Sequence, residues 1–94
     1  MEIKDAVRNA IAFASESLGP ERTADIRLEE IESSSVDSRP VWLITLSSQL
    51  VPAFRTMAAM LGHDLAREYK VFAVTKDNGE VLSMKIRLLV APSQ

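Results

Sequence analysis

The chain has 94 residues, a net charge of −2 at pH 7 and no cysteine. This length suits a single domain spanning 1–94 with one modest core. The absence of cysteine excludes disulfides and thiolate metal sites, and the small negative charge argues against a general electrostatic grip on nucleic acid.

The first segment predicts an amphipathic helix that ends at Gly19-Pro20, a pair that caps and stops helices. Charged residues interrupt its apolar ones, so we expect neither a secretory signal nor a membrane span. A cytoplasmic protein is the resulting expectation. The apolar positions at helical spacing are Ile3, Val7, Ala10, Ile11, Ala14 and Leu18.

Residues 24–33 alternate apolar and charged side chains, which is typical of a strand. Ile31 falls out of phase with Ile26 and Leu28, so we expect a bulge near Glu29-Glu30 and an edge position in the sheet. The polar stretch 33–40 predicts a turn or loop.

Residues 41–48, VWLITLSS, are rich in β-branched and apolar side chains and predict a central strand. Trp42, Ile44 and Leu46 share one face, which we expect to meet the helix. In the following 49–67 segment, Phe54, Met57 and Leu61 recur at helical spacing after Pro52, so a short helix is predicted there.

The last structured stretch runs from Tyr69 to Leu89 and predicts a β-hairpin around Asp77-Asn78-Gly79. A three-residue loop with Gly79 in the left-handed region would pair Phe72 with Met84, Val74 with Leu82, Lys70 with Ile86 and Lys76 with Glu80. One face then carries the core. The opposite face would hold Val71, Ala73 and Val81.

These elements predict an α+β fold, in which an N-terminal helix packs on a four-stranded antiparallel meander with a short helix or long loop between strands 2 and 3. The order of elements and the run KVFAVTKDNGEVLSMKIR resemble PepSY-like domains and the broader cystatin-like architecture. That resemblance implies a non-enzymatic module of the kind that binds or restrains peptidases. It carries over no catalytic residue.

No stretch of the chain predicts catalytic, cofactor or metal chemistry. His63 is the only histidine, and its spacing to Asp64 and Glu68 matches no metal motif. Glu29, Glu30 and Glu32 form the densest acidic spot, which we interpret as solvated. No G-x-S-x-G sequence and no phosphate-binding glycine loop occurs. We therefore expect no enzymatic activity and no cofactor.

Apolar residues without obvious cover are the feature most relevant to function. Three arrangements would cover them: the 49–67 segment caps the open sheet face, two copies form a homodimer through the sheet face, or a different protein binds to it. On this basis we expect a protein-binding or regulatory module. Its predicted contact residues are Phe54, Met57, Met60, Leu61, Val71, Ala73 and Val81.

An alternative of a different class is a small-ligand-binding or enzymatic cystatin-like domain with a pocket between helix and sheet. The polar lining of that pocket would come from Tyr69, His63, Thr45 and Arg87. This alternative predicts a concave pocket at which at least two of these side chains meet.

Overall fold

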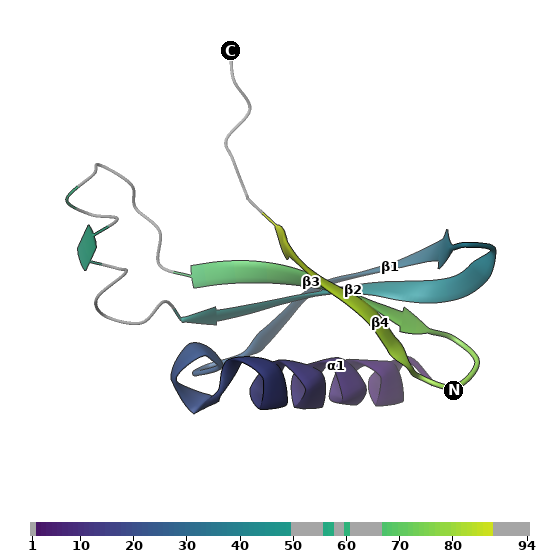
Figure 1. Ribbon diagram of the computed structural model, residues 1–94, viewed down its shortest axis with the longest axis horizontal. Helices are drawn as coiled ribbons and strands as arrows, with labels where there is room; N and C mark the ends of the chain where they lie inside the picture. The colour runs from purple at the N-terminus through teal and green to yellow at the C-terminus, as the bar shows by residue number, and fades with distance from the viewer. Residues whose placement is uncertain (1, 50–55, 58–59, 61–66, 88–94) are drawn as a thin grey trace, which may run out of the picture.

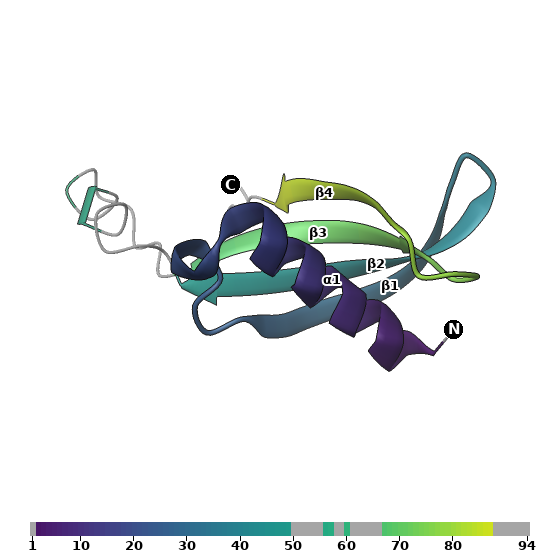
Figure 2. The ribbon, with the colours of Figure 1, turned by 60° about the horizontal axis from the view of Figure 1, so that its bottom comes forward.

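The computed structural model describes residues 2–49, 56–57, 60 and 67–87. The described strands form one antiparallel sheet in the order β1-β2-β3-β4, and the helix lies across one of its faces (Figures 1 and 2). The predicted α+β arrangement is thus confirmed. The elements are α1 (Ile3–Leu18), the 3-10 turn η1 (Pro20–Arg22), β1 (Arg27–Val36), β2 (Arg39–Gln49), β3 (Arg67–Thr75) and β4 (Val81–Arg87).

Helix α1 packs closely on the sheet because a row of small residues faces it. Ala6, Ala10 and Ala14 recur every four residues, so they lie on one side of the helix, and all three are buried. Gly19 ends the helix with φ of 80°, and its amide donates to the Ser15 carbonyl at 3.1 Å. Only glycine adopts this backbone readily, as the sequence predicted.

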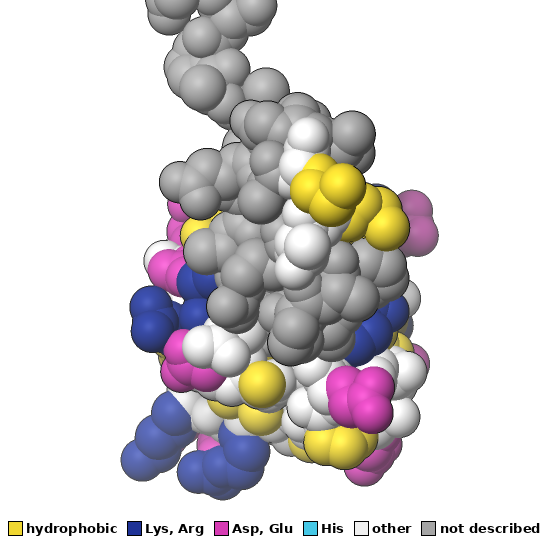
Figure 3. Space-filling view, turned by 90° about the vertical axis from the view of Figure 1, so that its left-hand side faces the viewer, with side chains coloured by type: hydrophobic (Ala, Val, Ile, Leu, Met, Phe, Trp, Pro, Cys, Tyr) yellow, Lys and Arg dark blue, Asp and Glu magenta, His cyan; other side chains and the backbone are white. Residues whose placement is uncertain are grey.

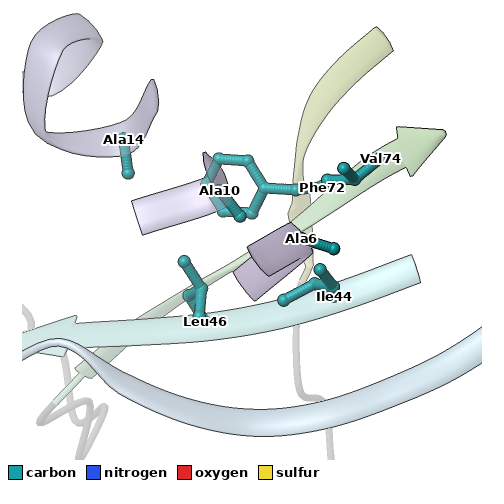
Figure 4. Packing of buried hydrophobic residues seen from close by; sticks show 7 residues of the cluster. All are labelled: Ala6, Ala10, Ala14, Ile44, Leu46, Phe72 and Val74. Carbon is teal, nitrogen blue, oxygen red and sulfur yellow. The ribbon is translucent and has the colours of Figure 1, made fainter. Parts of the chain in front are cut away.

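The core lies between these alanines and the two central strands (Figure 4). Ile44 and Leu46 come from β2, and Phe72 and Val74 come from β3. The predicted helix-facing side of β2 is therefore confirmed. Trp42 continues this row at the margin of the core, where the Lys76 ammonium lies 4.0 Å from the centre of its ring.

The hairpin between β1 and β2 has longer strands and a shorter turn than expected. The prediction of a loop over 33–40 is wrong, because β1 extends to Val36 and β2 starts at Arg39. Asp37 and Ser38 alone make the turn, with φ of 49° and 68°. Two successive positive φ values match the twist of the flanking strands, so this turn lets the hairpin continue through polar side chains.

Edge strand β1 contains the predicted bulge. Leu28 pairs with Leu46 and Glu30 pairs with Thr45, which leaves Glu29 without an opposite residue. The extra residue returns Ile31 to the helix side, opposite Ile44. This explains the break in the apolar alternation.

The turn between β3 and β4 differs from the predicted three-residue loop. Thr75 and Glu80 flank a four-residue loop, and Gly79 takes φ of 73° within it. Val74 consequently pairs with Val81 rather than Leu82, and a bulge restores the predicted pairs Phe72 with Met84 and Lys70 with Ile86. The predicted pair of Lys76 with Glu80 does not form, because Thr75 is the residue that bonds to Glu80, with its amide donating to the Glu80 carbonyl at 2.9 Å.

Candidate functional site

The outer face of the sheet, which points away from α1, carries a polar network centred on Arg67 at the start of β3. Its Nε donates to the Ser47 hydroxyl at 2.8 Å and its Nη1 donates to the Asp25 carboxylate at 3.0 Å. Its Nη2 donates to the main-chain carbonyls of Ser47 and Asp25. With all three nitrogens used and the side chain 12% exposed, Arg67 fastens the start of β1 to the central strands.

Asp25 has an unusual backbone that this network stabilises. Its φ of 53° lies in the left-handed region, and its carboxylate also contacts Arg27 at 3.0 Å. The hydrogen bond from Arg67 is the main reason that the pKa of Asp25 lies below its ordinary value of 3.8. This carboxylate therefore remains an anion at neutral pH and serves as a structural anchor.

The bulge in β1 brings two consecutive carboxylates to the outer face. Glu29 accepts a hydrogen bond from the Ser47 hydroxyl at 2.5 Å. Glu30 accepts one from Arg87 at 2.9 Å, and the same Arg87 nitrogen lies 3.0 Å from the Thr45 hydroxyl. Because Arg87 belongs to β4 and Glu30 to β1, this ion pair joins the two edge strands across the outer face.

A second polar cluster lies on the helix side, below the end of α1. Lys70 is buried there, and its ammonium lies 2.6 Å from the Glu68 carboxylate. Arg22 reaches the same carboxylate oxygen at 3.3 Å. One carboxylate thus compensates a buried lysine and a half-buried arginine, which is the arrangement that makes a buried charge tolerable.

The cavity beside this cluster is small. It is lined by Ala14, Leu18, Leu46 and Phe72 together with the polar cluster, and its volume is about 10 Å³. A volume of this order holds about one water molecule. This cavity is therefore too small for an organic ligand.

A much larger hollow lies between the first half of α1 and the edge strand β1. It measures about 500 Å³ and is open to solvent. Leu28 and Ile3 line it while being 47% and 42% exposed. Its walls are mainly apolar, with the charged ends of Glu2 and Lys4 at the rim.

The predicted contact residues are divided between several parts of the structure. On the outer face, Ala73 is buried and Val71 is half-buried. Val81 instead packs against the helix-side core, because the longer turn shifts its register, so its predicted place on the outer face is wrong. Phe54 and Leu61 lie outside the described residues.

Met57 and Met60 remain accessible between β2 and β3. Both are helical, and their exposed fractions are 55% and 81%. Figure 3 views this end of the molecule and shows hydrophobic side chains at its surface.

The polar residues of the alternative pocket meet only in part. Thr45 and Arg87 are hydrogen-bonded, and Tyr69 pairs with Arg87 across the β3–β4 ladder. Neither described cavity is lined by these side chains. His63 lies outside the described residues.

Two structural residues were missed by the sequence reasoning. Arg67 carried no recognisable pattern, because its partners come from the loop before β1 and from β2. Lys70 could have been recognised, since the period of the 69–75 strand places it on the same face as Phe72 and Val74. A lysine at that position requires a nearby carboxylate, which Glu68 supplies.

Comparison of the chain with protein-family models, with curated proteins and with solved structures finds no match. The resemblance to PepSY-like domains therefore stays a prediction. Among the residues that the structure describes, no three carboxylate or histidine side chains gather in a way that could hold a metal ion. No described helix has the length and apolar character required to cross a bilayer.

Proposed function

We propose that this chain is a protein-binding or regulatory module that acts through the outer sheet face and the 49–67 segment. The observation that carries the proposal is the exposure of Met57 and Met60, at 55% and 81%, in the segment that connects the two central strands. Methionine side chains are flexible and polarisable, which suits an adaptable protein contact.

The outer sheet face contributes limited apolar area to the same proposal, because Val41 and Ala73 on this face are buried. Leu43 and Val71 are half-buried there, and Lys85 is exposed beside Val71 across the ladder. An apolar centre with a charged rim is the usual composition of a protein interface. The cavity below the end of α1 holds about one water molecule, and the larger hollow beside β1 is lined by none of the predicted pocket residues, which favours a protein-binding surface over a ligand-binding pocket.

Site-specific crosslinking tests the proposal. A photoreactive amino acid at Met60 should form a covalent adduct with a defined protein in cells of the source organism. The same residue at Glu16, which is exposed on α1, serves as the control position. A peptidase is the first partner class to examine, as the resemblance to PepSY-like domains implies.

Binding of the captured protein, once purified, should then be measured by calorimetry. Met60→Glu should weaken binding by about tenfold or more, since it places a charge in the contact. Glu16→Gln should leave the affinity unchanged. Equal adducts at both positions, or full affinity of the Met60→Glu variant, would refute the proposal.

A further inference from the structure

The sheet has two open edges of opposite character. Among the described residues, β1 pairs only with β2 and β4 pairs only with β3, so each presents one unpaired side (Figure 2). An unpaired edge is a template on which another strand can be added. The residues that line each edge indicate which strand would fit.

The outer side of edge β1 is acidic and that of edge β4 is basic. Glu30 and Glu32 are exposed on β1, opposite Thr45 and Leu43 of the outer face. Lys85 and Arg87 occupy the outer side of β4. Pairing β1 with another β1 would oppose acids, and pairing β4 with another β4 would oppose bases. Only β1 with β4 brings opposite charges together.

The helix sides of the same two edges carry exposed apolar residues, although Ser33 and Ser35 of β1 also lie on that side. Ile86 is 73% exposed on β4, with Met84 half-buried two residues before it. On β1, Leu28 and Ile31 border the open hollow of about 500 Å³ beside α1. A strand added to β1 would direct its helix-side residues toward this hollow.

The topology allows this contact between two identical copies that have the same orientation. In an antiparallel sheet of four strands, β1 and β4 run in opposite directions. A second copy with its helix on the same side therefore adds its β1 antiparallel to β4 of the first. The antiparallel order simply continues across the junction.

One register aligns the exposed residues of the two edges. When Glu32 lies opposite Lys85 of the neighbour, Ile31 lies opposite its Ile86. Glu30 and Arg87 also come opposite each other, although these two already form an ion pair within one chain. The register joins 30–34 of β1 to 83–87 of β4 and stops short of the bulge that turns Val81 to the helix side. From these observations we infer that the chain associates with itself head to tail, through edge β1 of one copy and edge β4 of the next.

Such a contact joins different surfaces of the two copies, so it either closes into a ring or continues as a chain. Two copies that form both junctions would make the smallest ring, with eight strands. The charged junctions should weaken as salt increases. This inference can be tested separately from the proposed partner surface, because the two share only Lys85, at the rim of that surface, whereas Glu32 and Ile86 belong to the edges alone.

Sedimentation velocity over a range of protein concentrations tests the inference. The wild-type chain should associate at low salt and dissociate at high salt. Glu32→Lys and Lys85→Glu should each weaken association by about tenfold, because a like-charge pair replaces an attractive one at the junction. An equimolar mixture of the two variants should associate again, since each junction between them regains opposite charges.

Three controls make the outcome decisive. Glu16→Lys changes the net charge as Glu32→Lys does but lies on α1, so it should associate like the wild type. Circular dichroism should show that Glu32→Lys and Lys85→Glu remain folded, since the side chains of Glu32 and Lys85 are exposed. Met60→Glu should also leave self-association unchanged, which separates this contact from the proposed partner surface.

A wild-type chain that stays monomeric at all concentrations overturns the inference. So does unchanged association of both charge variants, or a mixture that fails to recover it.

Discussion

Phe72 is the side chain whose removal should cost most. It is 1% exposed and stands at the centre of the core, between the alanines of α1 and the strands β2 and β3 (Figure 4). Truncation of a buried phenylalanine to alanine costs about 3–5 kcal/mol. A domain of 94 residues has a free energy of unfolding of roughly 5–14 kcal/mol, so Phe72→Ala should remove about a fifth of it or more.

Phe13 offers a matched comparison because it contacts the same ring. The two ring centroids are 6.3 Å apart at an interplanar angle of 79°, an edge-to-face contact. Phe13 is 36% exposed, so about two-thirds of its area is buried and Phe13→Ala should cost about 1–2 kcal/mol. The pair should also show a coupling energy of about 0.5–1.5 kcal/mol in a double-mutant cycle.

Urea unfolding of the wild type, both single variants and the double variant measures these quantities. The transition midpoint should fall much further for Phe72→Ala than for Phe13→Ala. Equal losses for the two single variants would show that Phe13 is buried as deeply as Phe72. Strict additivity would show that the edge-to-face contact contributes nothing to stability.

Other substitutions test the charged clusters and the turn. Arg67 lowers the pKa of folded Asp25 below 3.8, so the stability from this pair is present above pH 3.8 and is lost as the pH falls through the lower folded pKa. Asp25→Asn should therefore lose less stability between neutral and acidic pH than the wild type does. An unchanged dependence of unfolding free energy on acidic pH would contradict this. Gly79→Ala should cost about 1–2 kcal/mol because φ is 73°, with Gly79→Asn costing less in the same melts. Lys70→Met should change the free energy of unfolding by less than about 1.5 kcal/mol, since Arg22 still pairs with Glu68. Glu68→Leu should cost about 3–5 kcal/mol, because it leaves the Lys70 ammonium buried without its carboxylate. The opposite order in urea melts would show that Lys70 does not depend on Glu68.

The fold could be predicted from local patterns because each pattern has a direct structural cause. The helical spacing from Ile3 to Leu18, the stop at Gly19 and the apolar strand 41–48 each specify an element without long-range information. The phase break at Ile31 also predicted the bulge correctly.

Turn lengths were predicted less well, since they depend on contacts from outside the turn. The polar stretch 33–40 does not specify a loop length by itself. In the fold, Lys76 contacts both strands of this hairpin, since its amide donates to the Pro40 carbonyl at 3.0 Å and its ammonium donates to the Ser33 hydroxyl. At the second hairpin, the side-chain amide of Asn9 donates from Nδ2 to the Gly79 carbonyl at 3.0 Å and connects the loop to α1. Such contacts are not visible in the local sequence.

The candidate surfaces could likewise be predicted only in part from the sequence. The sequence showed that Met57 and Met60 are apolar residues of a connecting segment, but their exposure is a property of the folded chain. The charges of the two strands were also visible in the sequence. That β1 and β4 occupy opposite open edges, with their charged and apolar sides aligned, depends on strand order.

The sequence by itself thus determined the helix, most of the strand positions and the helix-side core of β2 and β3, because hydrophobic period and backbone preference act over a few residues. Tertiary structure alone decided which charges pair, as with Arg67 and Asp25 or Arg87 and Glu30. Those partners are more than 40 positions apart, and only the packed sheet brings them within hydrogen-bonding distance.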